Sequence, residues 1–269
     1  MATESRPRVS AYGVVALSCV AGSGGLLLFG LFLALGPPGL VDLGLGTAPA
    51  LAVDALLSAL FFAQHSGMVR RGWQRRLSAL VPPAYLPAMY GAASGIVLLA
   101  VVGLWQEVGQ PVVAVPAWGR WAIRLLWLGG AGIMLWSWRA LGELDALGLQ
   151  LIHGWPGERR ATAAAFRVTG PYRWVRHPMY MATLLFLWGY PNPTPDRLLL
   201  NALWSLWVIA ATRLEERDLA ADLGDQYRIY QRRVPMLIPH RRPVTDGELP
   251  GGGGPGPRTG QPQGTTWKP

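Results

Sequence analysis

The sequence predicts an all-α membrane protein, a polytopic bundle of five to six transmembrane segments with a proline-turned helical hairpin near the C-terminus. Of the 269 residues, 51% are hydrophobic and only 14% are charged, whereas an ordinary soluble domain has about 25% charged residues. The apolar residues also arrive in blocks of about 20, the length of helix that crosses a bilayer. The composition excludes a mainly disordered chain, and the single cysteine, Cys19, excludes a disulfide scaffold.

The first predicted span runs from Ala11 to Gly36, a stretch without a charged residue. As a helix it is about 39 Å long, which exceeds the ~30 Å hydrocarbon core of a bilayer. It is also longer than the apolar part of a secretory signal, and no small-x-small cleavage site follows it. We therefore expect an uncleaved membrane helix.

Five further apolar blocks follow, at about Ala48 to Met68, Ala84 to Trp105, Trp118 to Leu141, Met179 to Tyr190 and Leu198 to Thr212. The last two are joined by residues 191–196, Pro-Asn-Pro-Thr-Pro-Asp. A helix cannot continue through three prolines in five positions, so these two blocks form a tight helical hairpin. Its first block makes only about 18 Å of helix, and whether the hairpin spans the bilayer or re-enters stays open.

These patterns divide the chain into a short N-terminus (1–10), membrane helices with a long polar connection (11–165), a C-terminal core rich in polar motifs (166–240) and a tail (241–269). In the tail, 14 of 29 residues are Gly or Pro. Such a segment buries little apolar surface, so we expect it to be disordered.

The positive charge predicts the orientation. The net charge is +9, and the arginines gather before the first span, between the second and third, in the fourth connection and after the hairpin. By the positive-inside rule both termini and the segment 142–177 are cytoplasmic, and we expect a bacterial inner membrane. Because the charge lies between apolar blocks, it favours contact with membrane lipids and not with nucleic acid.

Four polar residues fall within or at the ends of the predicted spans: Asp54, Gln64, His65 and Arg124. Ionisable groups inside a membrane are functional candidates. Arg124 can equally extend its charge to the interface, and His65 can equally be a structural histidine. His65 is the strongest candidate because it directly precedes a basic turn.

The densest polar motif is residues 168–180, Val-Thr-Gly-Pro-Tyr-Arg-Trp-Val-Arg-His-Pro-Met-Tyr. Pro178 suits the first turn of a helix, so free backbone N–H groups are expected beside His177, Arg176 and Arg173. A helix N-terminus with arginines is a suitable site for a carboxylate or phosphate. The alternative is a basic membrane anchor.

A second motif follows the hairpin, where Glu215 and Glu216 lie at the cytoplasmic mouth. On a continuous helix Glu216, Tyr227 and Tyr230 share one face, although Gly224 is placed to interrupt that helix. Carboxylates bind ribose hydroxyls or an ammonium group, and aromatic rings hold a purine or a sulfonium cation. The alternative is an ordinary solvated helix.

These motifs, with Gly-Asp-Gln-Tyr-Arg-Ile-Tyr at 224–230 and Val-Pro-Met-Leu-Ile-Pro at 234–239, resemble the core of the isoprenylcysteine carboxyl methyltransferase family. The resemblance implies an integral membrane enzyme that uses S-adenosyl-L-methionine, with residues 166–240 as its cofactor-binding core. The cofactor-binding residues that it implies are Tyr172, Arg176, His177, Pro178, Tyr180, Glu215, Glu216, Tyr227 and Tyr230.

Within that family, Gln-His-Ser-Gly-Met-Val-Arg at 64–70 and Glu-Glu-Arg-Asp-Leu at 215–219 resemble the bacterial methanethiol S-methyltransferases. This resemblance implies methylation of a small thiol, methanethiol to dimethyl sulfide. His65 is the candidate proton acceptor and Arg213 the candidate holder of the anion, although neither role follows from spacing. A prenylcysteine carboxylate or a lipid is the alternative acceptor.

A haem- or quinone-binding protein that uses His65, His153 and His177 is the alternative of another class, although the histidines lack metal-ligand spacing.

Overall fold

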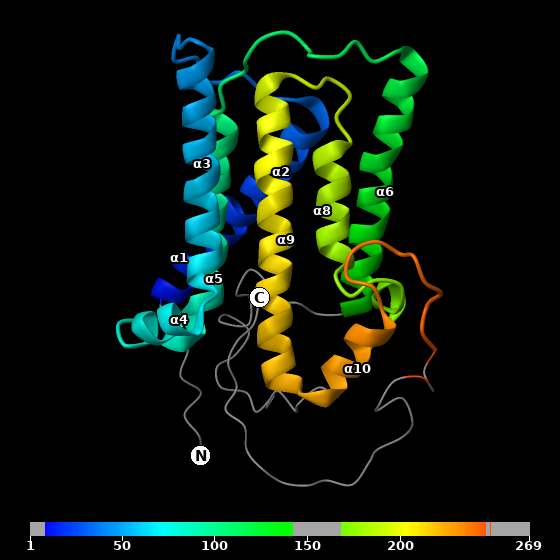
Figure 1. Cartoon of the computed structure of the whole chain (residues 1–269). Helices are drawn as coiled ribbons and strands as arrows, with labels where there is room; N and C mark the ends of the chain where they lie inside the picture. Colours follow the sequence, from blue (N-terminus) through cyan, green and yellow to red (C-terminus); the bar gives the residue numbers. More distant parts are fainter. Residues whose placement is uncertain (1–8, 142–167, 246–247, 249–269) are drawn as a thin grey trace, which may run out of the picture.

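The computed structural model describes residues 9–141, 168–245 and 248, and every regular element among them is a helix (Figure 1). In chain order the elements are α1 (Val9–Leu17), the π-helical turn η1 (Ser18–Ser23), α2 (Gly24–Leu35), α3 (Thr47–Met68), α4 (Arg71–Ser78), the 3₁₀ turn η2 (Pro83–Tyr85), α5 (Leu86–Leu104), α6 (Ala117–Leu141), the 3₁₀ turn η3 (Gly170–Arg173), α8 (Pro178–Trp188), α9 (Pro195–Leu223) and α10 (Asp225–Arg233).

The predicted membrane bundle is confirmed. Four helical stretches, 12–35, 47–68, 83–104 and 195–223, are long and apolar enough to cross a membrane. The fourth predicted span is the helix α6, which has 25 residues and carries three arginines, and the first arm of the hairpin is the short apolar helix α8. The second arm, α9, continues to Leu223, well beyond the expected Thr212, and its 29 residues make about 43 Å of helix. One end of α9 therefore extends past the depth of a bilayer.

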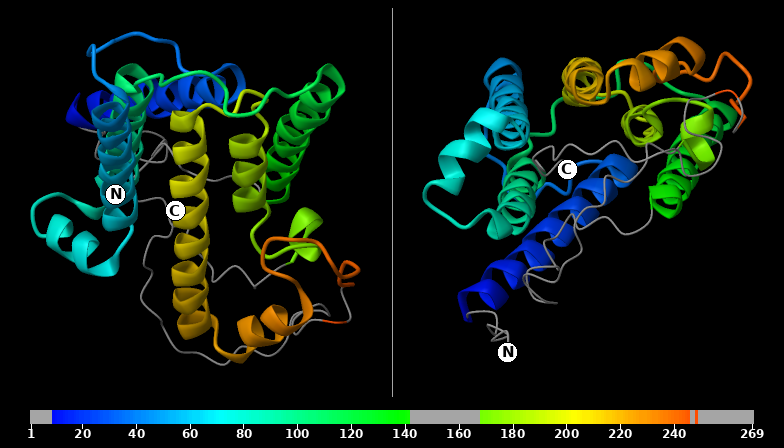
Figure 2. Two further views of the ribbon diagram at one scale, coloured as in Figure 1. Left: turned by 45° about the horizontal axis from the view of Figure 1, so that its top comes forward. Right: turned by 90° about the horizontal axis from the view of Figure 1, so that it is seen from below.

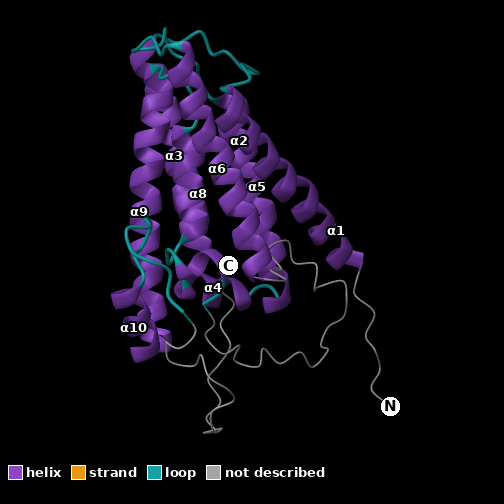
Figure 3. Cartoon of the chain, turned by 90° about the vertical axis from the view of Figure 1, so that its right-hand side faces the viewer, coloured by secondary structure: helices purple, strands orange, loops and turns teal. Residues whose placement is uncertain are grey.

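The long helices run side by side, as Figures 1 and 3 show, with α9 between the α3–α5 pair and the α8–α6 pair. The helix formed by α1, η1 and α2 is strongly tilted against them, which is clearest in the view from below (Figure 2). It crosses α5 closely because of Gly95: a Cβ atom there would lie 2.0 Å from the carbonyl oxygen of Ala21. Small residues allow this kind of close approach between membrane helices.

Aromatic rings fill the centre of the bundle. Trp204 of α9 stacks on Phe61 of α3 and on Phe29 of α2, with ring centroids 4.9 and 4.6 Å apart. Trp105 and Leu200 are fully buried in the same cluster. The core thus joins α2, α3, α5 and α9, and it holds the helices from which the site is built.

Buried carboxylates stabilise the end of the bundle that carries the hairpin turn. Asp196 accepts hydrogen bonds from Nε1 of Trp105 (3.1 Å) and from the backbone N–H of Val108 (3.2 Å). Asp54 accepts one from the backbone N–H of Gln106 (2.9 Å). Asp54, a candidate in the sequence, thus helps to shape the loop after α5.

Two arginines, the buried Arg197 and the partly exposed Arg124, have a similar role at this end. Arg197 is 1% exposed and donates to the carbonyl oxygens of Leu33 (2.9 Å) and Leu187 (3.1 Å). Arg124 donates to the carbonyl oxygen of Ala34. Because the last turn of a helix leaves its carbonyl groups without partners, these two arginines complete the ends of α2 and α8.

The described part of the chain extends past Arg241, the predicted start of the tail. Val244 is buried against Tyr227, Tyr230 and Val234, and its N–H donates to the carbonyl oxygen of Arg173 at 3.1 Å. This buried valine packs the first residues of the predicted tail on the core. Residues 249–269 lie outside the described residues.

Candidate active site

Glu216, on the extended end of α9, lies at the centre of a polar cluster. Nε of Arg176 donates to its Oε1 at 2.5 Å, Nε2 of His177 lies 3.2 Å from the same oxygen, and Nε2 of Gln231 donates to Oε2 at 3.2 Å. Arg176 also donates to the carbonyl oxygens of Gln231 (2.9 Å) and Val234. The cluster therefore joins α9, α10 and the turn before α8.

A glycine turn makes this cluster possible. Gly224 has φ +58° and ψ −132°, a conformation that is open almost only to glycine, and it ends α9 so that α10 folds back toward Glu216. The continuous helix considered from the sequence does not form. Tyr227 and Tyr230 still come near Glu216, but they do so because the chain turns and not because of helical spacing.

The neighbouring carboxylate, Glu215, is in a different position. Its side chain is 42% exposed, against 12% for Glu216. Tyr180 is hydrogen-bonded to Glu215, and Nδ1 of His177 lies 3.9 Å from Oε2. Since protein donors already occupy the oxygens of Glu216, Glu215 is the carboxylate with room for a bound molecule.

His177 and Tyr180 form one wall of the site. Pro178 is the first residue of α8, as predicted, and the rings of His177 and Tyr180 stack with centroids 5.6 Å apart. The expected free N–H groups at Arg176 and His177 are in fact taken, since they donate to the carbonyl oxygens of Pro235 (2.9 Å) and Met236 (3.1 Å). This backbone pairing orients His177 toward the two carboxylates.

Three tyrosines close the site on the side of α10. Tyr230 donates through its hydroxyl to the carbonyl oxygen of Tyr172 at 2.7 Å, and the rings of Tyr227 and Tyr230 meet edge to face at 5.8 Å. Burial raises the pKa of the Tyr172 phenol above its ordinary value, and the charge of Glu215 raises this pKa further. Tyr172 is therefore a neutral hydrogen-bond donor at cellular pH.

His65 belongs to a second group, on α3 and α5. The hydroxyl oxygen of Tyr90 lies 3.0 Å from Nδ1 and 2.8 Å from Nε2 of His65. Gln64, one residue earlier, donates to the hydroxyl of Ser94 at 3.2 Å. A phenol and an imidazole in this contact can exchange a proton.

Aromatic rings surround His65 on its other sides. The ring centroids of Phe61 and Trp207 lie 5.0 and 5.4 Å from that of His65. Trp207 is fixed by its Nε1, which donates to Ser66 at 3.0 Å, and by stacking on Phe62 at 5.0 Å. The imidazole therefore lies in a closely packed, largely apolar environment.

Tyr90 relates the two groups. The phenols of Tyr90 and Tyr180 lie within electrostatic range of each other, and Tyr180 is hydrogen-bonded to Glu215. The His65–Tyr90 pair therefore lies in the neighbourhood of Tyr180 and Glu215. Tyr90 is not among the residues predicted from the sequence. Two polar residues one helical turn apart in an apolar block, Tyr90 and Ser94, are the pattern that could have identified it.

Other candidates are not brought to the site. Arg213 is exposed on α9, and no interaction in the described part of the chain joins it to His65 or Glu216. His153 lies outside the described residues. Within residues 9–141, 168–245 and 248, no group of three His, Cys, Asp or Glu side chains has the arrangement that a metal ion needs.

Comparison with known proteins gives consistent matches. A family model described as phospholipid methyltransferase matches residues 121–226. A methanethiol S-methyltransferase from a Pseudomonas species is 36% identical over 221 residues, which are 80% of this chain and 84% of that protein. The enzyme of the same name from Mycobacterium tuberculosis is 34% identical over 198 residues (71% and 78%), and that from Pseudomonas deceptionensis is 33% identical over 211 residues (77% and 80%). No solved structure shows significant similarity to the chain.

Proposed function

Because the chain belongs to the family of membrane methyltransferases that contains the methanethiol S-methyltransferases, we propose that it transfers a methyl group from S-adenosyl-L-methionine to a small thiol. With methanethiol as the acceptor the product is dimethyl sulfide. The observation that carries the proposal is the His65–Tyr90 pair, which has Tyr180 and Glu215 in its electrostatic neighbourhood. The phenol–imidazole pair suits a proton acceptor, and the Glu215 carboxylate suits a cationic donor.

The residues around Glu215 fit the methyl donor. S-adenosyl-L-methionine carries a sulfonium and an ammonium cation, and when bound it supplies the methyl group. The exposed carboxylate of Glu215 can hold the ammonium group or the ribose, and the stacked rings of His177 and Tyr180 offer π faces to the sulfonium. Arg176 and Glu216 keep His177 in place, and Tyr172, Tyr227 and Tyr230 close the pocket.

The residues around His65 fit the acceptor. A thiol must lose its proton before it attacks, since the thiolate is the nucleophile. We infer that the thiol proton passes to the Tyr90 oxygen while the Tyr90 hydroxyl proton passes to a ring nitrogen of His65. The thiolate sulfur then bonds to the methyl carbon, the bond from that carbon to the sulfonium sulfur breaks, and its electron pair stays on the donor sulfur.

The packing of this region favours a small acceptor. Phe61 stacks on Trp204 at 4.9 Å and Phe62 stacks on Trp207 at 5.0 Å, so the walls beside His65 are rigid and aromatic. A closely packed site rejects added methylene groups. This supports methanethiol over a prenylcysteine carboxylate or a lipid. Because Arg213 is exposed and no interaction within the described residues joins it to His65, the positive charge of the donor stabilises the thiolate in our proposal.

The orientation belongs to the same proposal. The arginine-bearing helices α4 and α10 lie at the same end of the bundle as the last turns of α9 (Figure 1). With this end in the cytoplasm of a bacterial inner membrane, the polar donor enters from the cytoplasm. A volatile thiol reaches His65 through the bilayer.

Headspace gas chromatography tests the activity directly. Purified protein in detergent, supplied with S-adenosyl-L-methionine and methanethiol, should release dimethyl sulfide, and the His65→Gln variant should release far less while it still binds S-adenosylhomocysteine. Calorimetry measures that binding. If the parent protein binds S-adenosylhomocysteine but forms no dimethyl sulfide, the thiol substrate is wrong; if it does not bind the nucleoside, the donor is wrong.

A further inference from the structure

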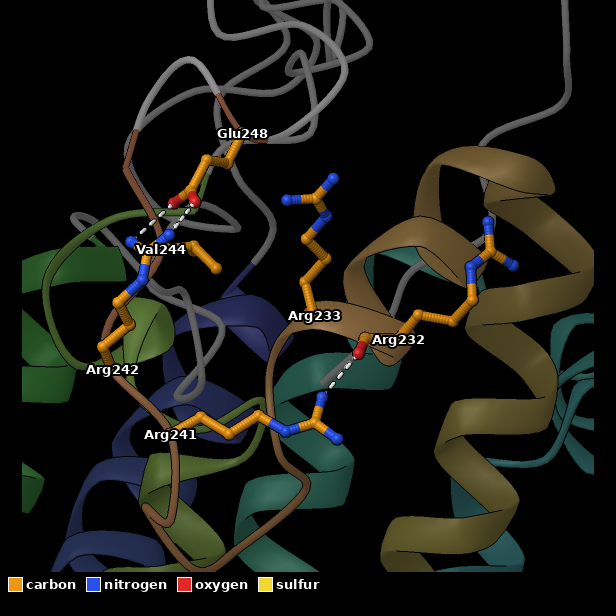
Figure 4. Close-up of a pocket in the computed structure, with 6 residues that line it drawn as sticks. All are labelled: Arg232, Arg233, Arg241, Arg242, Val244 and Glu248. Atoms are coloured by element: carbon orange, nitrogen blue, oxygen red, sulfur yellow. Dashed lines mark hydrogen bonds and ion pairs between the residues drawn. The ribbon is translucent and has the colours of Figure 1, made fainter.

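A pocket of about 500 Å³ lies outside the candidate active site, between the last turn of α10 and the segment that follows the core (Figure 4). None of its residues takes part in the proposed methyl transfer. The lining residues are Arg232, Arg233, Arg241, Arg242, Val244 and Glu248.

The pocket has a surplus of positive charge, with four guanidinium groups against one carboxylate. Arg242 pairs with Glu248, and Arg241 donates to the carbonyl oxygen of Arg232 at 2.6 Å, as the dashed lines of Figure 4 show. The guanidinium groups of Arg232 and Arg233 have no partner within the part of the chain that the structure describes. Arginines from two segments around one cavity suit the oxygens of a phosphate group.

The segment after α10, which lines one side of the pocket, is fixed at the start of the apolar helix α8. The backbone N–H groups of Arg176 and His177 donate to Pro235 and Met236, so this segment is tied to the residues just before α8. In Figure 1 this segment rises beside the lower end of α8. Ile238, in the same segment, is 74% exposed, which an apolar side chain at a lipid surface would be.

We propose that this pocket binds the phosphate of an anionic glycerophospholipid from the cytoplasmic leaflet. The inference rests on the proposed orientation of the chain and is independent of the methyl acceptor. The bound headgroup connects α10 to Arg241 and Arg242. Since α10 carries Gln231, Tyr227 and Tyr230, the lipid also steadies one wall of the candidate active site.

Lipid binding to the full chain in detergent, followed by native mass spectrometry, tests the proposal. The probes are phosphatidylglycerol, phosphatidylcholine and inorganic phosphate as a competitor. The Arg233→Ala variant should bind phosphatidylglycerol three- to tenfold more weakly, because one arginine near an anionic lipid surface contributes a factor of about five. Arg228→Ala is the matched control, since Arg228 is an exposed arginine of α10 that does not line the pocket.

Three results would overturn the proposal. The first is an equal loss of phosphatidylglycerol affinity in Arg233→Ala and Arg228→Ala. The second is equal binding of phosphatidylcholine and phosphatidylglycerol. The third is displacement of the lipid by inorganic phosphate at similar concentration, which would make the pocket a site for the free ion. Thermal melting confirms that Arg233→Ala is folded. Should it melt early, Arg232→Ala provides the same comparison.

Discussion

Two neighbouring carboxylates, Glu215 and Glu216, have different tasks because α9 presents them to different surroundings. Glu216 is surrounded by donors of the protein itself, from Arg176, His177 and Gln231. Glu215 is more exposed and has its main contacts with Tyr180 and His177. Glu216 therefore stabilises the fold, and Glu215 can bind a ligand.

The first prediction distinguishes the ligand-binding role of Glu215 from the structural role of Glu216. Glu215→Gln should weaken binding of S-adenosylhomocysteine by about 1 to 3 kcal/mol, the usual loss when a hydrogen bond to a charged group is removed, with the melting temperature unchanged. Glu216→Gln should lower the free energy of unfolding by about 3 kcal/mol, because it leaves Arg176 without its ion partner in a partly buried site. Calorimetry and thermal melting measure the two effects, and the reverse pattern would show that Glu216 holds the donor.

The second prediction concerns Tyr90. Tyr90→Phe should lower kcat about 100-fold, since it removes the hydroxyl that passes the thiol proton to His65, while the affinity for S-adenosylhomocysteine stays the same. The rate of the variant should also rise more steeply with pH than that of the parent, because only thiol that is already ionised can react. Initial rates of dimethyl sulfide formation across pH measure both.

Tyr12→Phe is the matched control, because Tyr12 is an exposed tyrosine of α1 that belongs to neither polar group of the site. The Tyr12→Phe variant should have the kcat and the pH profile of the parent protein. A Tyr90→Phe variant with an unchanged rate and pH profile would remove Tyr90 from the mechanism and leave it a packing role.

At the level of elements, the turn between α9 and α10 positions half of the site. Gly224→Ala places a Cβ in a backbone conformation that only glycine adopts readily, at a cost of about 1 to 3 kcal/mol in the free energy of unfolding. Relief of that strain would move Gln231 away from Glu216, so we expect weaker S-adenosylhomocysteine binding as well. Gly103→Ala, in the last turn of α5 where an added Cβ meets open space, should have neither effect. Melting curves and calorimetry compare the two variants.

The segment after α10 is also part of the folded core. A chain that stops after Glu248 keeps Val244 on Tyr227 and Tyr230, so it should melt and methylate like the full protein. A chain that stops after Arg242 loses this buried valine and the bond from its N–H to Arg173, and its melting temperature should fall. Equal melting of the two truncated proteins would show that Val244 adds nothing to stability.

At the scale of the whole molecule, the arginine distribution predicts the topology. Reporter domains fused after the C-terminus should be active in the cytoplasm, whereas a reporter inserted between Gln106 and Ala117 should be active on the opposite side. Paired fusions to a periplasmic phosphatase and to a fluorescent protein measure this. Phosphatase activity at the C-terminus would place the candidate active site outside the cell and remove its supply of methyl donor.

Composition and residue order were enough to identify much of this protein. The membrane bundle, the hairpin at the prolines and the helix start at Pro178 were all predicted, because transfer of apolar residues into a bilayer and the geometry of proline act locally along the chain. The motifs at 168–180 and 215–230 also pointed to the two segments that meet around Glu216, and similarity to the methyltransferase family confirmed the kind of enzyme.

Only the tertiary structure decided which side chains meet. How each helix is rotated about its axis determines these contacts. It brings Tyr90 to His65 and gives Glu215 and Glu216 different surroundings. It also turns Asp54 and Arg124 to structural hydrogen bonds and leaves Arg213 exposed. Membrane helices such as α3, α5 and α9 are apolar on nearly every face, so hydrophobic periodicity does not identify the face that points inward. Helix crossings, such as the one where Gly95 meets Ala21, set those rotations, and they are contacts between segments far apart in the sequence.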